Sequence, residues 1–252
     1  MNIIIITQNE PFYLSENLNY LLSILDKDVK VVGCVVNDVS PFGKEESFLS
    51  KVLKTYKIFG LSFFIYYSCK FLYSKFFKKS LKSFLISQKI PIIKINENIN
   101  SHKSLKKIKS YNPDLLVSIL GNQIFKTNLI NLAPKGCINL HTSLLPKYRG
   151  LMPTFWVLKN NEDYTGISVF FVDEGIDSGP IIVQRKVKII KKNQADLIMK
   201  TKKIGMECIA EAILLIKDNL VKLKPNDKNQ KSYYSFPKRE DVIEFKKNNV
   251  FF

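Results

Sequence analysis

Short apolar runs, separated by stretches with helical periodicity, are the feature that most restricts the fold of this chain. The runs at residues 3–7 and 29–36 predict buried strands, and the segment near residues 15–25 between them predicts a helix. A strand, a helix and a second strand in this order form a βαβ unit with parallel strands. Further strands are predicted at residues 91–95, 113–120, 136–141, 166–172 and 181–190. The sequence therefore predicts an α/β fold with a mostly parallel, twisted sheet flanked by helices.

The other periodic segments place helices around this sheet. Residues 104–111 predict a basic helix, and residues 196–217 predict a helix that closes the main body. Residues 51–89 alternate lysine with aromatic and aliphatic residues at helical spacing, which indicates an amphipathic helical insertion. After residue 217 the composition shifts to Lys, Asn, Asp and Pro. We expect one main domain at residues 1–217 and a short C-terminal extension at residues 218–252.

The insertion at residues 51–89 admits two interpretations. Basic residues beside aromatic ones suit peripheral contact with a membrane surface or with RNA. The same pattern suits a helical hairpin that packs on the sheet and extends its lysines into solvent. The whole chain has a net charge of +17, which fits a polyanionic partner, an anionic membrane, a phosphorylated substrate or lysines on solvated faces.

The cysteines and the N-terminus indicate the setting of the protein. Cys34, Cys69, Cys137 and Cys208 lie far apart and form no C-x-x-C pair, so we expect reduced thiols and no metal site. The chain opens on an apolar strand without a basic leader, and no apolar run is long enough to span a bilayer. These features predict a cytoplasmic location.

The loop after the first predicted strand excludes two common ligands. Dinucleotide and P-loop proteins place glycines there to receive phosphates, whereas residues 7–12 contain none. NAD and ATP are therefore disfavoured.

Polar groups capable of acyl-transfer chemistry follow the later strands. Asn139 and His141 lie two residues apart on one predicted strand, so both side chains point to the same face. Asp177 lies in a turn-rich loop at residues 173–179. An amide can donate to an oxyanion, an imidazole can carry a proton near neutral pH, and a carboxylate can orient that imidazole. The other histidine, His102, lies in a polar stretch, so His141 is the candidate imidazole.

Three separated blocks resemble the N10-formyltetrahydrofolate-dependent formyltransferases. These are N-L-H-T-S-L-L-P-K-Y-R-G at residues 139–150, T-G at 165–166 and E-G-I-D-S-G-P-I-I at 174–182. They occur in the family's order and at its approximate spacing. The resemblance covers residues 114–188 well, the first strands loosely and the insertion not at all. It implies a Rossmann-like fold, in which residues 1–217 form the catalytic domain.

The resemblance also implies roles for individual residues. An acceptor amine attacks the formyl carbon directly, Asn139 and protonated His141 stabilise the oxyanion, and Asp177 holds His141 and a proton-shuttling water. The formyl donor is N10-formyltetrahydrofolate, and no metal takes part. The residues expected to bind this donor follow a central strand or lie in the acidic loop: Leu120, Gly121, Asn122, Asp173, Gly175 and Ile176.

The acceptor is predicted from segments outside the blocks. The loop at residues 7–13 departs from the phosphate loop of glycinamide ribonucleotide enzymes, and the short extension and its aromatic residues favour a nucleotide-linked amino sugar. Seven residues are expected to bind this acceptor: Asn9, Tyr13, Lys147, Tyr148, Arg149, Tyr234 and Phe236. The tail aromatics would equally serve to anchor the tail to the core.

Three further expectations remain beside this one. Methionyl-tRNA is the alternative acceptor, because the positive charge suits it, although no stable nucleic-acid complex is expected. A non-enzymatic protein that binds RNA or membrane through residues 51–89 is the alternative of another class. A small sugar-modifying enzyme is also expected to form a homodimer.

Overall fold

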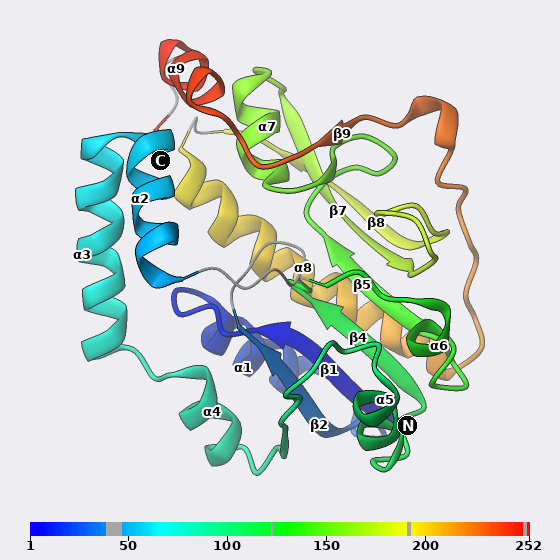
Figure 1. The fold of residues 1–252 in the computed structure, drawn as a ribbon. Coiled ribbons are helices and arrows are strands. Elements are labelled where there is room, and N and C mark those ends of the chain that lie inside the picture. Colours follow the sequence, from blue (N-terminus) through cyan, green and yellow to red (C-terminus); the bar gives the residue numbers. More distant parts are fainter. Residues whose placement is uncertain (39–46, 122, 191–192, 249–250) are drawn as a thin grey trace.

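A computed structural model describes residues 1–38, 47–121, 123–190, 193–248 and 251–252 (Figure 1). Within these residues the main sheet has seven strands in the order β3-β2-β1-β4-β5-β7-β8. β1 through β5 pair in parallel, whereas β7 and β8 are antiparallel. The strands are β1 (Asn2–Gln8), β2 (Lys30–Asn37), β3 (Ile92–Ile93), β4 (Leu115–Ile119), β5 (Cys137–His141), β7 (Tyr164–Phe171) and β8 (Ile181–Lys188). The predicted α/β fold with a mostly parallel sheet is confirmed.

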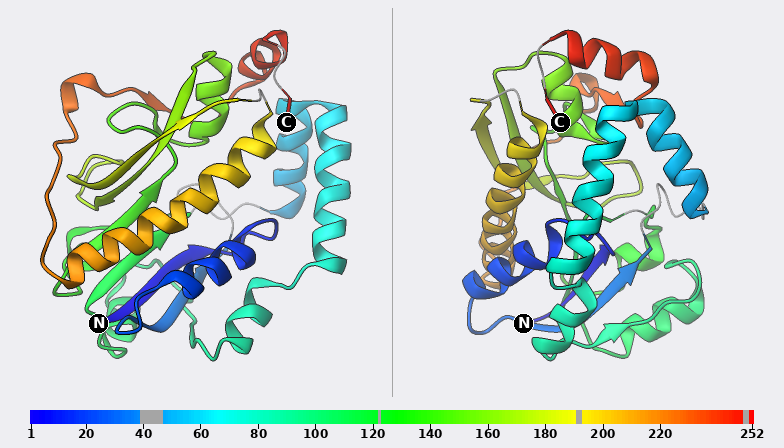
Figure 2. Two further views of the ribbon diagram at one scale, coloured as in Figure 1. Left: turned by 180° about the vertical axis from the view of Figure 1, so that it is seen from behind. Right: turned by 90° about the vertical axis from the view of Figure 1, so that its left-hand side faces the viewer.

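Helices cover both faces of this sheet, as the views in Figures 1 and 2 show. The helices are α1 (Leu14–Ile24), α2 (Phe48–Phe59), α3 (Leu61–Phe77), α4 (Leu81–Ser87), α5 (His102–Lys109), α6 (Thr127–Ile130), α7 (Pro153–Lys159), α8 (Gln194–Lys217) and α9 (Arg239–Lys247). A short 3-10 helix follows α8 at Lys228–Gln230. A second, two-stranded sheet pairs β6 (Arg149–Gly150) with β9 (Tyr233–Tyr234).

The first strand shows why its sequence is apolar without alternation. Ile3 and Ile5 belong to the core cluster that α1 and α8 cover. Ile4 and Ile6 belong to the cluster on the opposite face, beneath α5 and α6. Successive side chains of a strand point to opposite faces, so a central strand covered on both sides needs apolar residues throughout.

The segment predicted as one helical insertion consists of α2, α3 and α4. Ser47 caps α2 and Ser80 caps α4, each accepting a hydrogen bond from a backbone N–H of the first turn. Gly60 separates α2 from α3 with φ +84°, a conformation that favours glycine and lets α3 turn back beside α2 (Figure 1). A separate hydrophobic cluster packs α2 against α7 and α9 and includes Phe59, Phe155 and Phe245.

The boundaries of the predicted strands and helices shifted by one or two residues, and several elements were missed. The strand predicted at residues 91–95 is only Ile92–Ile93, and the helix predicted at 104–111 begins at His102, because Ser101 caps it. α6, α7, β6, β9 and α9 were not predicted. Of these, α7 had a signal in the sequence, since Pro153 occupies its first turn.

Candidate functional site

A cavity of about 620 Å³ lies at the carboxyl ends of the central strands. Its wall includes Gln8 at the end of β1, Leu120 and Gly121 after β4, and His141 at the end of β5. β1 and β4 are neighbours from which the strand order runs in opposite directions, which is where ligands bind in open α/β sheets. The volume is in the range of small-molecule sites, roughly 300–1,000 Å³.

His141 is buried, and both of its ring nitrogens face oxygen atoms. Nε2 lies 2.7 Å from the backbone carbonyl oxygen of Tyr148, which can only accept a hydrogen bond. Nδ1 lies 3.5 Å from Oδ2 of Asp177. Both ring nitrogens therefore face hydrogen-bond acceptors, and these two contacts fix the orientation of the ring.

Asp177 is fixed from three sides. Its backbone adopts φ +48°, and its Oδ2 accepts a hydrogen bond from the N–H of Gly150 at 2.8 Å. The side-chain amide of Asn226 donates to the carbonyl oxygens of Asp177 and Gly179, each at 2.9 Å. These contacts come from β6 and from the C-terminal extension, so the position of the carboxylate depends on how these two segments dock.

Asn139 lines the same cavity on β5. In the described part of the chain its side-chain amide forms no hydrogen bond, and it is half-buried. A half-buried amide on a cavity wall can donate to a bound ligand without first giving up a protein contact. Asn139, His141 and Asp177 therefore line one cavity. The two-residue spacing predicted a shared face for Asn139 and His141, whereas Asp177 was expected from the family resemblance alone.

The loop between β5 and β6 is held rigid by the neighbouring strands. Ser168 of β7 accepts from the N–H of Leu145 and donates to the carbonyl of Ser143. Gln184 of β8 donates to the carbonyl of Leu145 at 2.9 Å. The Ser143 hydroxyl itself donates to the carbonyl of Lys147, so it forms no nucleophile–base pair with His141.

The residues expected to bind the donor surround the catalytic candidates. Leu120, Gly121, Asp173, Gly175 and Ile176 all line the cavity. Asn122 lies outside the described residues. A Cβ at Gly121 would lie 2.5 Å from the Ser118 hydroxyl, so the absence of a side chain keeps this end of β4 open. The carboxylate of Asp173 accepts hydrogen bonds from the N–H of Gly175 and from the hydroxyl of Ser178, and these two contacts shape the acidic loop.

Of the seven residues expected to bind the acceptor, two line the cavity and five do not. Tyr13 and Phe236 line the cavity. The other five are outside its wall: Asn9, Lys147, Tyr148, Arg149 and Tyr234.

Three of these five residues are engaged within the protein. Tyr148 and Tyr234 stack with ring centroids 5.2 Å apart, and Trp156 stacks on Tyr234 at 4.7 Å. Burial and a hydrogen bond to Glu162 raise the pKa of Tyr148. Arg149 is buried and donates to the side-chain oxygen of Asn226 at 2.7 Å. These contacts anchor the C-terminal extension to the core.

Several residues of the site escaped the sequence analysis. Asn226 lies in the segment after residue 217, whose composition predicts only a C-terminal extension, and no local signal marks it. Lys70 of α3 and Lys202 of α8 also line the cavity. The helical patterns around Lys70 and Lys202 do not indicate a shared site, because the two residues are 132 positions apart in sequence and meet only in the fold.

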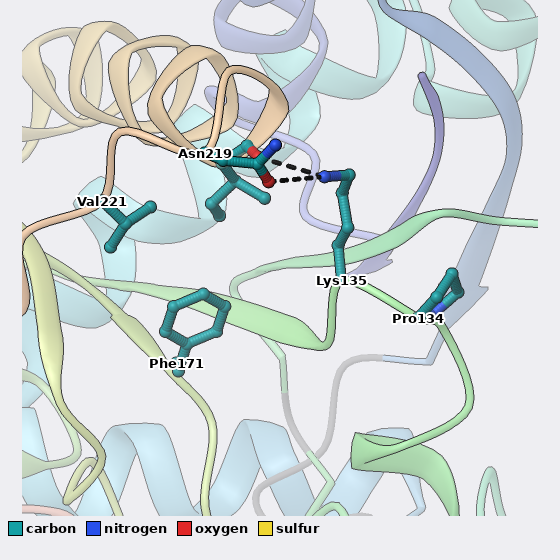
Figure 3. Close-up of a pocket in the computed structure, with 6 residues that line it drawn as sticks. Pro134, Lys135, Phe171, Asn219 and Val221 are labelled. Atoms are coloured by element: carbon teal, nitrogen blue, oxygen red, sulfur yellow. Dashed lines mark hydrogen bonds between the residues drawn. The ribbon is translucent and has the colours of Figure 1, made fainter.

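A second hollow of about 350 Å³ lies beside the amino end of β5, away from His141 (Figure 3). Its Lys135 donates to the carbonyl of Ile216 at 3.3 Å and to the side chain of Asn219 at 3.2 Å. The lysine thereby satisfies a carbonyl in the last turn of α8, a structural role at a helix C-terminus.

The described residues contain no group of three or more His, Cys, Asp or Glu side chains placed to hold a metal ion. No helix in that part of the chain combines the length and apolar character needed to cross a lipid bilayer. Cys34, Cys137 and Cys208 are buried, and Cys69 is exposed.

The fold and the site define an α/β protein with an imidazole, a carboxylate and a free amide at the carboxyl ends of its parallel strands. A sequence family described as formyl transferase matches residues 77–213, more than half of the chain. The chain belongs to the formyl transferase family, which confirms the resemblance found in its sequence.

Curated relatives match the same central region. The chain is 35% identical over 148 residues to a methionyl-tRNA formyltransferase of Kosmotoga olearia, a match that covers 58% of this chain and 48% of that protein. It is 36% identical over 130 residues to one of Thermodesulfovibrio yellowstonii, covering 51% and 42%. The chain thus spans about half the length of the curated relatives it matches.

Solved structures share the fold. An N-formyltransferase from Helicobacter canadensis, in complex with folinic acid and dTDP-3-aminofucose, has a TM-score of 0.59 at 20% identity, covering 96% of this chain and 72% of that chain. A phosphoribosylglycinamide formyltransferase from Anaplasma phagocytophilum has a TM-score of 0.63 at 15% identity, covering 94% and 99%. At these identities the likeness establishes the fold alone.

Proposed function

We propose that this protein transfers a formyl group from N10-formyltetrahydrofolate to an amine. The observation that carries the proposal is the convergence of Asn139, His141 and Asp177 on one ligand-sized cavity. The folate supplies an activated formyl carbon. The largely apolar cavity, with the bare backbone of Gly121 at one end and the carboxylate of Asp173 in its wall, fits a flat ring that carries N–H donors.

Each side chain has a role that follows from its contacts. The amine forms a bond to the formyl carbon, and the carbonyl oxygen of the formyl group becomes negatively charged. The free amide of Asn139 donates to that oxygen, and the positive charge of protonated His141 stabilises it. The bond from the formyl carbon to N10 then breaks, and the proton lost by the amine passes to N10 through water held by Asp177.

The candidate acceptors are methionyl-tRNA and a nucleotide-linked amino sugar, and the observations favour methionyl-tRNA. The curated relatives named above are methionyl-tRNA formyltransferases at 35% and 36% identity, which supports methionyl-tRNA first. The stacking of Tyr234 on Trp156 removes part of the sequence argument for an amino sugar, because the ring is already occupied. The amino sugar stays a second candidate, since Phe236 and the aromatic residues of α3 close one side of the cavity around a small ligand.

The test is a parallel assay of both acceptors. Purified protein is incubated with 10-formyltetrahydrofolate and either methionyl-tRNA or a panel of nucleotide-linked amino sugars. Release of tetrahydrofolate is followed by absorbance, and the gain of one formyl group by mass spectrometry. His141→Ala should abolish turnover, whereas His102→Ala, which removes an exposed histidine, should leave it unchanged. Absence of formyl transfer to every amine would refute the proposal.

A further inference from the structure

One wall of the cavity comes from the insertion and not from the matched family region. Phe59 of α2 and Phe63, Tyr66 and Tyr67 of α3 all line it, and they precede residue 77, where the family match begins. Phe63 stacks on Phe59 with centroids 4.5 Å apart and on Tyr67 at 5.3 Å. The wall is therefore a preformed row of aromatic rings, which suits contact with another flat ring.

Two cations accompany this wall. Of the lysines and arginines in the described residues, Lys70 and Lys202 are the ones that line the cavity. Both ammonium groups lie over the ring of Tyr13, at 4.5 Å and 4.8 Å from its centroid, and Lys70 also donates to the Tyr13 hydroxyl. Lys70, Lys202 and Tyr13 thus form one cluster, built by α3, α8 and the segment before α1.

The carboxylates near this cluster form hydrogen bonds or ion pairs with groups outside it. Glu10 lies 3.4 Å from Lys202 but also accepts the backbone N–H groups of Phe12 and Tyr13. Glu16 pairs with Lys78 at 2.9 Å, and Asp196 has contacts of its own. Burial lowers the pKa of Lys202, and Glu10 opposes that shift. In the described part of the chain Lys70 forms no ion pair, and its ammonium group has the Tyr13 hydroxyl and the rings of Phe12, Tyr13 and Tyr66 as partners.

We propose that Lys70, Lys202 and the Tyr13 hydroxyl form a subsite for an anionic group, a phosphate or a carboxylate, on a ligand whose flat ring packs against Phe63 and Tyr67. The inference rests on the proposed function, because it assigns the subsite to one of the two reactants. A phosphate would belong to the acceptor, and a carboxylate to the glutamate part of the folate. The insertion would then select the ligand of this chain.

Direct binding separates these sources. Isothermal titration calorimetry measures the affinity for inorganic pyrophosphate and for 5-formyltetrahydrofolate. Loss of one charge-assisted contact should weaken binding about tenfold. Lys70→Gln carries the test, because it leaves no carboxylate without a partner, and Lys202→Gln should act in the same direction. The matched controls are Lys75→Gln on α3 and Lys203→Gln on α8, both exposed and outside the cavity wall.

Weaker pyrophosphate binding in Lys70→Gln supports a phosphate subsite, and weaker 5-formyltetrahydrofolate binding alone supports a carboxylate subsite. Unchanged affinity for both ligands, in a variant that melts like the wild type, overturns the inference. If Lys70→Gln and Lys202→Gln transfer the formyl group with wild-type kinetics, the inferred subsite is wrong and the proposed function stands. Pyrophosphate binding through Lys70 in a protein that transfers no formyl group overturns the proposed function alone.

The outer face of the same helix carries a second, independent inference. Leu61, Ile65, Leu72 and Phe76 follow helical spacing on α3, and more than half of each side chain is exposed. Leu49 and Leu53 of α2 are equally exposed. Isolated exposed apolar residues are common, but a continuous apolar stripe marks an interaction surface.

Charge identifies what this face contacts. Residues 47–96 contain ten lysines and no aspartate or glutamate. Five of these lysines lie on α2 and α3, and one of the five, Lys70, lines the cavity. A second copy of the chain would bring the same positive charge against it. We infer that the outer face of α2 and α3 binds an anionic lipid surface, with the apolar stripe entering the headgroup region and the lysines meeting phosphates.

Vesicle sedimentation tests this contact. The protein should bind vesicles of equimolar phosphatidylcholine and phosphatidylglycerol, bind vesicles of phosphatidylcholine alone weakly, and be released by salt. Leu72→Glu and Phe76→Glu should each weaken binding about tenfold or more. Leu220→Glu, at an exposed position in the C-terminal extension, should not. A polarity-sensitive fluorophore on the exposed Cys69 of α3 should shift to the blue on binding.

Absence of binding to the anionic vesicles at low salt overturns the second inference. A wild-type dimer that becomes monomeric in Leu72→Glu also overturns it, because a second copy of the chain would then cover this face. Binding of an RNA oligonucleotide that these substitutions abolish, without vesicle binding, also overturns it.

Discussion

Oδ2 of Asp177 lies 3.5 Å from Nδ1 of His141 while the same oxygen accepts the N–H of Gly150. Both side chains are largely buried, at 8% exposure for His141 and 13% for Asp177. A carboxylate held by a backbone N–H cannot turn away from the imidazole without losing that hydrogen bond. The pair therefore holds the imidazole at the cavity wall in a fixed orientation.

Asp177→Asn removes the charge and keeps the shape. The amide oxygen still accepts the N–H of Gly150, but the protonated imidazole loses its counter-charge, so we expect kcat to fall about a hundredfold or more. The melting temperature should change little. Steady-state kinetics of formyl transfer measure the effect, with Asp163→Asn at an exposed position as the control. A variant with wild-type kcat would show that the carboxylate charge has no part in the reaction.

Asn226 acts on the reaction through Asp177. Asn226→Ala removes both donations to the backbone of the acidic loop and the acceptor of Arg149, and should lower both stability and kcat. Asn226→Asp keeps the contact to Arg149 but loses the donations. Because the carboxylate gains an ion pair with Arg149, we expect this second variant to lose less stability than Asn226→Ala and still to lose kcat. If it matched the wild type in rate, Asn226 would serve only to dock the extension.

Substitutions at Gly150 and Gly136 distinguish the cost of a strained backbone φ from the cost of a steric clash of the added Cβ. Both have positive φ, at +94° and +84°. A Cβ at Gly150 would lie 2.2 Å from the carbonyl oxygen of Tyr234, whereas a Cβ at Gly136 meets nothing closer than 3.6 Å. Gly136→Ala should cost about 1 kcal/mol from strain alone. Gly150→Ala should cost more in urea unfolding and should also reduce activity, because the β6–β9 pair and the Gly150 N–H must shift.

The sequence predicted those parts of the site that lie on regular elements. Asn139 and His141 point into one cavity because a strand repeats every two residues, and that spacing was visible. The apolar runs likewise identified a sheet covered on both faces. Asp177 was placed by its resemblance to a family pattern, since loop conformation at φ +48° has no periodic signal.

The rest depended on contacts between distant segments. Arg149 and Asn226 are 77 positions apart, and nothing near either one indicates the other. Tyr234 stacks on Trp156, and an aromatic residue in a polar tail gives no sign of which ring it will meet. Lys70 lies on α3, whose other lysine, Lys75, is exposed, so only the fold distinguishes the two.

Stability should decline at alkaline pH because buried thiols resist ionisation. Burial raises the pKa of Cys34 to about 12 and that of Cys208 to about 11. The unfolded chain ionises these thiols from about pH 9, while the folded protein keeps them neutral, so unfolding is favoured as pH rises. The free energy of unfolding in urea should fall between about pH 8 and about pH 10, by about 1 kcal/mol for Cys34. Cys34→Ala should reduce this slope and Cys69→Ser, at an exposed position, should not; equal slopes in all three proteins would contradict the assignment.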